Sequence, residues 1–368
     1  MEKRIFFDHA AGVFGNPSSQ HNEGRMAKNA LENARKRCAD ALKVPHETLY
    51  FTSGGTESNS IALFSNLMRP GKGRIISSLA EHASVREGML TLERFGKPTG
   101  CITVDTAGRV TQDTLARALK QYSDVRFISV MSVNNETGAV TDIAGLKDIL
   151  NKHTEKNKAQ VHFHCDLVQA VGKISVDITG WEIDSASISA HKLGGQRGIG
   201  LLYLRKPIEV FYSGGGQENG IRGGTENVQG AVNLADCLEA GIKGQEPSNC
   251  GAKERWQKLI TALSSIDRCT LIPGDRIALN DNFSPYILQA AFKDIPGEVM
   301  ARALDDLGFA VSTGSACSSS SPERPVLAAM GVPEDLRIEG IRISQGYSTT
   351  DEDIDALLYG IKEVLKFL

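Results

Sequence analysis

Short apolar runs that alternate with longer segments of helical periodicity constrain the fold of this chain more than any other feature. The apolar runs, which we predict to be strands, occupy residues 49–52, 74–77, 100–104, 126–133, 161–166, 185–189 and 200–204. The helical patterns before and between them occupy residues 25–43, 56–68, 82–95, 112–120 and 142–156. Strands separated by helices of about 10–15 residues are typical of βαβ units. The sequence therefore predicts an α/β fold in which helices flank a mostly parallel sheet.

A polar stretch at residues 242–253 is the candidate boundary between two domains, because it contains Gly244, Pro247 and Gly251. The elements expected beyond it are helices at 254–265, 298–307 and 351–367 and strands near 270–272, 287–292 and 309–313. We expect residues 14–245 to form a large domain, and residues 1–13 together with 246–368 to form a smaller α+β domain.

Charge and composition exclude several classes of partner. The chain has 41 Lys and Arg residues against 44 Asp and Glu residues, a formal net charge of −3, so we expect no nucleic-acid partner. No apolar run approaches the ~18 residues that are needed to cross a bilayer, so we expect no membrane association. The seven cysteines are scattered without C-x-x-C or zinc-ligand spacing, which indicates reduced thiols, no metal site and a cytoplasmic location.

Polar residues follow five of the predicted strands at the edge where ligands bind in parallel sheets. These residues are Thr56, His82, Asn135, Asp166 with Gln169, and His191 with Lys192. Taken alone, each has an ordinary structural explanation, such as a helix cap for Asp166 or a surface turn for Lys192. Their convergence at one edge is the more informative observation.

The chemistry of these groups together suits one cofactor. Asp166 can hold a proton on a heteroaromatic nitrogen, and His82 can stack on a flat ring. The Gly-Gly-Thr turn at residues 54–56 opens a predicted helix, whose N–H groups and dipole attract anions. Lys192 ends a buried strand, so we expect partial desolvation that lowers its pKa and favours a Schiff base. The set predicts a site for pyridoxal 5'-phosphate (PLP).

Seven motifs connect these residues to a known family. In chain order they are F-T-S-G-G-T-E-S from residue 51, A-E-H-A-S-V from 80, V-N-N-E-T-G from 133, D-x-x-Q-A-V-G-K from 166, S-A-H-K-L-G-G from 189, G-G-G-Q-E-N-G-I-R-G-G-T-E-N from 214 and S-T-G-S-A-C-S-S from 312. The chain resembles the cysteine desulfurases of the class V aminotransferase family, which are PLP-dependent enzymes of fold type I. The Ser-rich segment around Cys317 is similar to that of the subgroup with a long mobile active-site loop.

The resemblance implies how the cofactor would be held. Lys192 would form the Schiff base, Asp166 would pair with the pyridine nitrogen, and His82 would stack on the ring and help to move protons. Gln169 and Asn135 would contact the phenolic oxygen and the substrate side. The implied phosphate ligands are Gly55, Thr56, Ser189, His191 and, reaching into the other subunit of a homodimer, Thr225.

The resemblance also implies the reaction. Arg342 would grip the carboxylate of L-cysteine through two parallel hydrogen bonds. Cys317 would attack the sulfur of the bound substrate, leaving an enzyme persulfide and releasing L-alanine. An ordinary buried cysteine is the alternative reading of Cys317, but its small polar neighbours at 312–316 and 318–322 make a poor core segment.

The predicted function is therefore a cysteine desulfurase that supplies sulfur for iron–sulfur clusters or for thiolated tRNA and cofactors, through an acceptor or scaffold protein. Two alternatives stay open at this point: a selenocysteine lyase or other PLP lyase, and a non-catalytic sulfur-transfer scaffold. The second is motivated by the N-terminus, where Asp8-His9-Ala10 runs almost directly into Phe14-Gly15-Asn16-Pro17. The family usually has a helix-containing segment between these two motifs.

Overall fold

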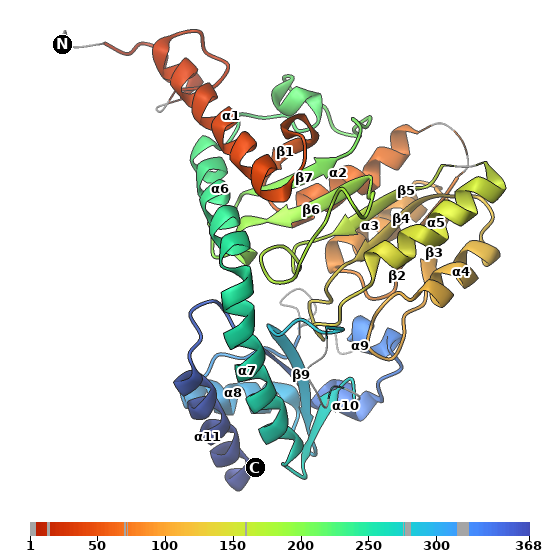
Figure 1. Cartoon of the computed structure of the whole chain (residues 1–368), viewed down its shortest axis with the longest axis vertical. Helices are drawn as coiled ribbons and strands as arrows, with labels where there is room; N and C mark the ends of the chain where they lie inside the picture. The colour runs from red at the N-terminus through yellow and green to blue at the C-terminus, as the bar shows by residue number, and fades with distance from the viewer. Residues whose placement is uncertain are drawn as a thin grey trace.

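A seven-stranded sheet forms the centre of the larger part of the molecule (Figure 1). The computed structural model describes residues 5–12, 15–69, 71, 73–158, 160–274, 276, 281–314 and 324–368, with the backbone alone at 246–249. Across the sheet the strands are β1 (Leu49–Thr52), β7 (Gly200–Leu204), β6 (Ser185–Ser189), β5 (His162–Asp166), β4 (Val125–Met131), β2 (Arg74–Ser78) and β3 (Thr99–Ile102). All neighbouring pairs are parallel except the two that involve β7. The predicted α/β fold with a mostly parallel sheet is confirmed.

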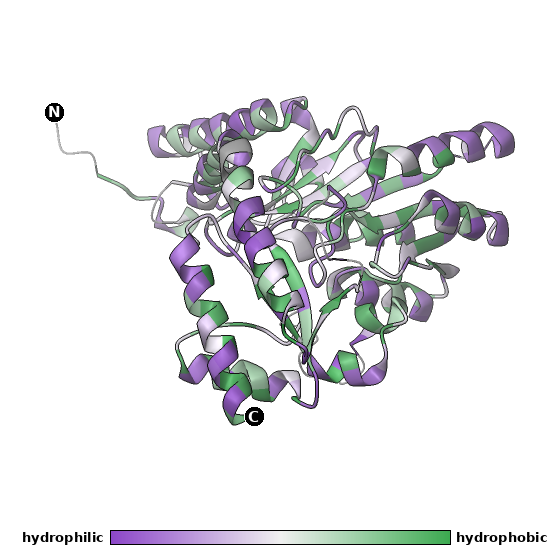
Figure 2. Ribbon diagram, turned by 60° about the horizontal axis from the view of Figure 1, so that its bottom comes forward, coloured by the Kyte–Doolittle hydropathy of each residue, from purple (hydrophilic) through white to green (hydrophobic). Residues whose placement is uncertain are grey.

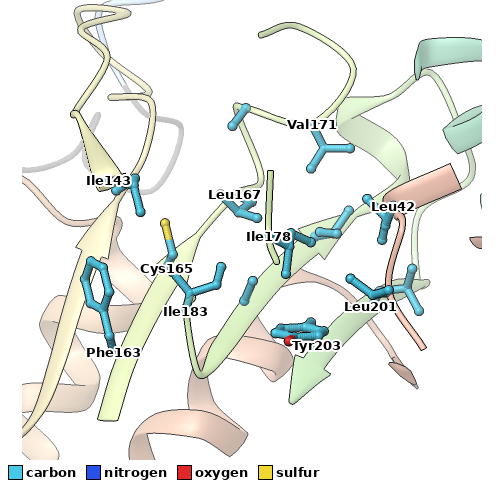
Figure 3. Close-up of a cluster of buried hydrophobic side chains, with 14 of the residues drawn as sticks. Leu42, Ile143, Phe163, Cys165, Leu167, Val171, Ile178, Ile183, Leu201 and Tyr203 are labelled. Carbon is cyan, nitrogen blue, oxygen red and sulfur yellow. The ribbon is translucent and has the colours of Figure 1, made fainter. Parts of the chain in front are cut away.

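Helices cover both faces of this sheet, because its strands carry apolar residues on both sides. Alternate residues of β2 and β4 belong to different apolar clusters: Ile76 and Ile128 to one, Ile75 and Phe127 to the other. The first cluster includes residues of α1 (Asn22–Leu42), α4 (Gln112–Gln121), α5 (Ile143–Asn157) and α6 (Val228–Lys243), and Figure 3 shows its centre around Phe163 and Cys165. The second includes residues of α2 (Gly55–Met68) and α3 (Ala83–Arg94). In Figure 2 the strands are largely green, whereas the helices also carry purple, hydrophilic residues.

Strand β4 ends two residues earlier than the predicted run at 126–133. Val133 instead forms an isolated bridge with Val140, which closes a tight turn. Inside this turn the Asn134 side-chain oxygen accepts the N–H groups of Glu136 and Thr137 at 2.9 and 3.0 Å. The turn therefore presents the following residue, Asn135, at the carboxyl edge of the sheet.

A second, antiparallel sheet lies in the lower part of the molecule in Figure 1. Its strands, in spatial order, are β10 (Gly340–Ser344), β9 (Ile287–Phe292) and β8 (Cys269–Ile272). The helices of this part are α7 (Gln245–Ser264), α8 (Gly297–Asp306), α9 (Pro325–Ala329), α10 (Glu334–Glu339) and α11 (Asp351–Phe367). A separate apolar cluster around Trp256 joins the sheet to α7, α8 and α11.

Two predictions about this part were wrong. The stretch at 242–253 is helical, because α6 and α7 meet at Gly244 and the chain enters α7 at Gln245. Pro247 lies in the first turn of that helix, where proline is tolerated. The strand expected at 309–313 is reduced to one bridge between Ser312 and Arg342, while β10, which was not predicted, pairs with β9. The division at residue 245 stays a prediction.

The remaining described elements are 3-10 turns at His9–Ala11, His46–Thr48, Ala190–Lys192 and Gln217–Gly220. Cys317 and its Ser-rich neighbours at 315–323 lie outside the described residues. Among the residues that the structure does describe, no helix combines the length and the apolarity that a membrane crossing requires.

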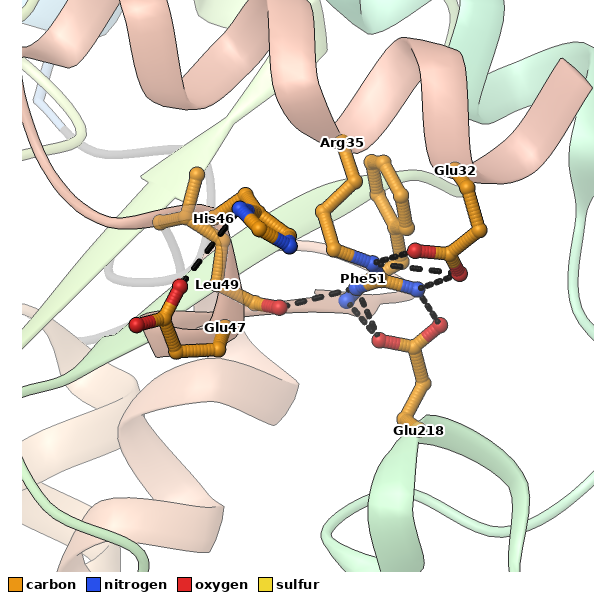
Figure 4. A network of polar contacts seen from close by, with 7 residues as sticks. All are labelled: Glu32, Arg35, His46, Glu47, Leu49, Phe51 and Glu218. Atoms are coloured by element: carbon orange, nitrogen blue, oxygen red, sulfur yellow. Dashed lines mark hydrogen bonds and ion pairs between the residues drawn. The ribbon is translucent and has the colours of Figure 1, made fainter. Parts of the chain in front are cut away.

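A buried ion pair fastens α1 to the sheet edge (Figure 4). The Arg35 guanidinium donates to both carboxylate oxygens of Glu218, at 2.7 and 2.8 Å, and to the carbonyl of Leu49 at 2.8 Å. Glu218 also accepts the N–H of Phe51 at 2.7 Å. The network links helix α1 and strand β1 to the Gly-rich segment at residues 214–227. The side chains of Arg35 and Glu218 are both buried.

Removing Glu218 should therefore destabilise the fold. Glu218→Ala leaves the Arg35 charge buried without its partner, so we expect the free energy of unfolding to fall by about 3–5 kcal/mol. Glu32 also contacts Arg35, at 3.2 Å, but its side chain is 49% exposed, so Glu32→Ala should cost about 1 kcal/mol or less. Urea denaturation measures both, and equal losses for the two variants would contradict this ranking.

Candidate active site

A cleft of about 310 Å³ opens at the carboxyl ends of β4, β5 and β6. Its lining residues are Gly55, Thr56, Asn59, His82, Met131, Asn135, Asp166, Val168, Gln169, Ser189, His191, Lys192 and Arg342. The structure thus brings together ten of the twelve site residues that the sequence predicted. Thr225 is exposed and does not line this cleft, and Cys317 lies outside the described residues.

Asp166 is the buried carboxylate of the cleft. It ends β5, and its Oδ1 accepts the N–H of Val168 at 2.9 Å, as a turn residue does. Its Oδ2 accepts the Nδ2 amide of Asn59 at 2.8 Å. Both oxygens of the side chain therefore accept a hydrogen bond from the protein. The residue therefore has the ordinary turn-forming role and also faces the cleft with a negative charge.

Asn59 is a site residue that the sequence analysis missed. It lies in the second turn of α2 and is fully buried, although asparagine favours caps and turns over helix interiors. A polar residue on the buried face of this helix was a signal that the analysis did not use. Its partner Asp166 is 107 residues away in the chain.

His82 caps the N-terminus of α3 through its own ring. Its Nδ1 accepts the N–H of Ser84 at 3.2 Å and lies 2.9 Å from the Ser84 hydroxyl oxygen. Burial lowers the pKa of His82, nearby Asp166 opposes that shift, and Lys192 adds to it. The ring is therefore neutral at ordinary pH, and its proton is on Nε2.

The phosphate end of the cleft is formed by the start of α2 and the end of β6. Gly55 and Thr56 begin α2, where backbone N–H groups and the helix dipole attract anions. A Cβ at position 55 would lie 2.6 Å from Val168, so only glycine fits there without a shift. Across from them the Ser189 hydroxyl lies 2.9 Å from His191 Nδ1.

Lys192 lies at the edge of the cleft. Strand β6 ends at Ser189, and the 3-10 turn at Ala190–Lys192 carries the lysine past the sheet edge, where it is exposed and lines the cleft. Its position at the cleft agrees with the prediction, and the lowered pKa expected from partial desolvation stays a prediction.

Arg342 brings the small sheet to the cleft. Its Nη1 donates to the carbonyl of Asn135 at 3.0 Å, so β10 is tied to the turn after β4. Burial lowers the pKa of Arg342, and the carboxylate of Glu136 opposes that shift. The side-chain oxygen of Asn135 is buried and has no hydrogen-bond partner among the described residues. An unsatisfied buried acceptor at this place is available to a ligand.

Glu81, which the sequence analysis did not select, lies behind the cleft between β2 and β4. It contacts the hydroxyls of Ser78 and Ser129 at 2.8 and 3.2 Å and accepts the N–H of Met131 at 2.7 Å. Burial raises the pKa of Glu81 from 4.5 to about 7, although the hydrogen bond from Ser78 opposes that shift. The acid therefore keeps its proton at pH values where an exposed glutamate has lost it.

The sequence model of the class V aminotransferases matches residues 6–357. The chain belongs to the class V aminotransferase family. The resemblance that the motifs indicated is thereby confirmed for the fold and for the family.

Named relatives of this class V aminotransferase chain include two proteins called cysteine desulfurase IscS. The one from Methanosarcina thermophila is 37% identical, over 96% of this chain and 86% of its own length. The one from Dictyoglomus turgidum is also 37% identical, over 100% of this chain and 96% of its own length. A solved structure titled NifS-like protein superposes with a TM-score of 0.87 at 33% identity, covering 96% of this chain and 92% of the other.

Glu81→Gln tests the buried acid of this class V aminotransferase. Because the pKa of Glu81 is raised on folding, its contribution to stability is complete below pH 4.5 and is lost as the pH rises through about 7. Glutamine stays neutral, so the stability of the variant relative to the wild type should increase between about pH 5 and pH 8 and then level off. Urea denaturation across this range measures the difference, with exposed Glu87→Gln as the control for loss of a carboxylate. If the free energy of unfolding of wild type and of Glu81→Gln changed with pH in parallel, the raised pKa of Glu81 would be contradicted.

Proposed function

We propose that this protein is a PLP-dependent cysteine desulfurase, which converts L-cysteine to L-alanine and retains the sulfur as a persulfide on Cys317. The main support is one cleft lined by an amine, a buried carboxylate, a neutral imidazole and a guanidinium: Lys192, Asp166, His82 and Arg342. The full-length relatives named cysteine desulfurase support the same activity. They do not favour a selenocysteine lyase or a non-catalytic scaffold.

The residues of the cleft fit PLP. The buried oxygen of Asn135, which has no partner within the described part of the chain, can accept a hydrogen bond from a ligand, and the Asp166 carboxylate can accept one from a protonated pyridine nitrogen. Gly55, Thr56, Ser189 and His191 would hold the phosphate, and Lys192 would hold the aldehyde carbon. When bound, the protonated ring supplies an electron sink for negative charge at the substrate Cα.

The protein's own groups would orient the substrate and move its protons. Arg342 would bind the cysteine carboxylate through two parallel hydrogen bonds, a geometry that suits guanidinium. The Lys192 amine, once released, can take and return a proton at the substrate Cα. Neutral His82 presents an Nε2–H, so in this state its ring nitrogen at the cleft donates and does not accept.

Cys317 would perform the sulfur transfer. Its thiolate would form an S–S bond with the substrate sulfur while the C–S bond breaks, and the electron pair would stay on carbon, which takes up a proton to give alanine. The chain approaches the cleft just before this residue, because Ser312 donates its N–H to the carbonyl of Arg342 at 3.2 Å. Cys317 follows Ser312 by five residues, a length of chain that spans at most about 17 Å.

The wider assignment includes a homodimer in the cytoplasm. Thr225 is exposed on the Gly-rich segment and does not line its own cleft, which suits a residue that reaches the phosphate site of a second copy. The persulfide sulfur would pass to an acceptor or scaffold protein, for iron–sulfur clusters or for thiolated tRNA and cofactors.

Sulfur transfer is tested with purified, PLP-loaded protein and labelled L-cysteine. We expect alanine and, with reductant, sulfide, together with a labelled persulfide on Cys317 by mass spectrometry. Cys317→Ala should keep bound PLP but lose alanine formation, by about 10³-fold or more, because no nucleophile remains. Cys101→Ala, at an exposed cysteine outside the cleft, is the matched control and should keep full activity. Alanine formation by Cys317→Ala would refute the nucleophile.

Attachment of the cofactor is tested separately. Lys192→Ala should bind PLP without a linkage that borohydride can trap, since the amine that forms the Schiff base is absent. Lys173→Met is the control, because Lys173 is another amine near the cleft, where it donates to Gln169 at 2.6 Å. Peptide mapping after reduction should find the cofactor on Lys192 in the wild type and in Lys173→Met. A trapped linkage in Lys192→Ala would contradict the assignment.

A further inference from the structure

We propose that a directional hydrogen-bond chain, running from Arg69 along β5 to Asp166 and His82, orients the Asn59 amide N–H toward Asp166 and holds the proton of His82 on Nε2 before any cofactor binds. The chain consists of Arg69, His162, Ser185, His164, Asn59 and Ser84, and we assign these as positioning residues. Their meaning for catalysis rests on the function proposed above. The series of hydrogen bonds itself is a property of the cofactor-free protein.

The first end of the chain is a group that can only donate. Arg69 Nη2 lies 3.3 Å from His162 Nδ1, and a guanidinium has no acceptor. His162 Nδ1 must therefore be the acceptor, which leaves the ring proton on Nε2. That nitrogen is 2.7 Å from the hydroxyl oxygen of Ser185, so the hydroxyl accepts.

The Ser185 hydroxyl, which accepts from His162, donates in turn to a second histidine. Its hydroxyl oxygen is 2.8 Å from His164 Nδ1, and its hydrogen is free to donate there because its oxygen accepts from His162. His164 therefore carries its proton on Nε2, which lies 2.9 Å from Asn59 Oδ1. The Ser187 hydroxyl, 3.5 Å from the same nitrogen, is a weaker second acceptor.

Both histidines are held neutral, although His164 is fully buried and His162 only half-buried. His162 and His164 pack on the ring of Phe127, with centroids 5.0 and 6.1 Å away and interplanar angles of 7° and 22°. Burial lowers the pKa of each ring to about 3. A neutral imidazole has one donor and one acceptor nitrogen, so a donor that faces one nitrogen fixes the proton on the other.

The other end of the chain is a group that can only accept. Asn59 turns its oxygen to His164, so its Nδ2 donates to Asp166 Oδ2 at 2.8 Å and to the Ser84 hydroxyl oxygen at 2.9 Å. An ionised carboxylate requires this same orientation of the amide. Ser84 then donates its hydroxyl hydrogen to His82 Nδ1, at 2.9 Å, and His82 keeps its proton on Nε2.

Arg69 at one end and the Asp166 carboxylate at the other thus each require the same donor-to-acceptor order along the hydrogen bonds. A permanent cation that donates and an anion that accepts leave no link free to reverse without breaking a hydrogen bond. Reversal would place two acceptors or two donors face to face in the interior, which is costly. The hydrogen-bond chain therefore directs the Asn59 amide N–H at Asp166, the residue that would pair with a protonated pyridine nitrogen.

The first test uses cofactor-free protein labelled with 15N-histidine. We expect His82, His162 and His164 each to show a neutral ring with one proton, on Nε2, at neutral pH, with signals assigned by single variants. His46, which is exposed and lies outside the hydrogen-bond chain, serves as the internal reference. An Nδ1–H tautomer or a charged ring at His162 or His164 would overturn the proposal. This result does not depend on PLP binding or on activity.

The second test compares two variants of one position. His164→Phe keeps an aromatic ring in place but breaks the chain, whereas His164→Gln can accept from Ser185 and donate to Asn59. We expect His164→Phe to weaken PLP binding by about tenfold or more and to change the absorbance spectrum of the bound cofactor, because the donor to Asp166 is no longer oriented. His164→Gln should restore both. Native affinity and spectrum in His164→Phe would overturn the proposal, while failure of the wild type to bind PLP would overturn the proposed function instead.

Discussion

A carboxylate buried at the end of a parallel strand is the constraint on which the site depends. Asp166 is 3% exposed, and a charge in such a place persists only with hydrogen-bond donors around it. Val168 supplies one from the next turn, and Asn59 supplies the other from α2. Both donors are available because β5 lies inside the sheet, with α2 packed against its face. The fold thus holds a negative charge at the position where a protonated ring nitrogen would bind.

The cleft also depends on contacts between segments that are distant in the chain. Arg342 reaches it from the small sheet and is tied to the carbonyl of Asn135, 207 residues away. Ser312 bridges to the same strand residue, so the segment that leads toward Cys317 starts at the cleft wall.

Much of this arrangement followed from local sequence patterns. The runs at 49–52, 185–189 and 200–204 match their strands end to end. Since parallel strands end at one edge, the residues after them had to meet there. Other features were not visible locally. Asn59, His164 and Glu81 matter through partners 48 to 107 residues away, and such pairs depend on strand register. The exposure of Lys192 was not visible either, because it follows from the 3-10 turn that carries the lysine past the end of β6.

The proposed site requires Asp166 to pair with a protonated pyridine nitrogen, so the protonation state of that nitrogen is the decisive measurement. The protein would be reconstituted with PLP labelled with 15N in the ring and followed by nitrogen NMR from acid to neutral pH. The account predicts a ring nitrogen that stays protonated to neutral pH in the wild type and loses its proton in Asp166→Asn, which keeps the size of the side chain. An unprotonated nitrogen in the wild type at neutral pH would contradict it.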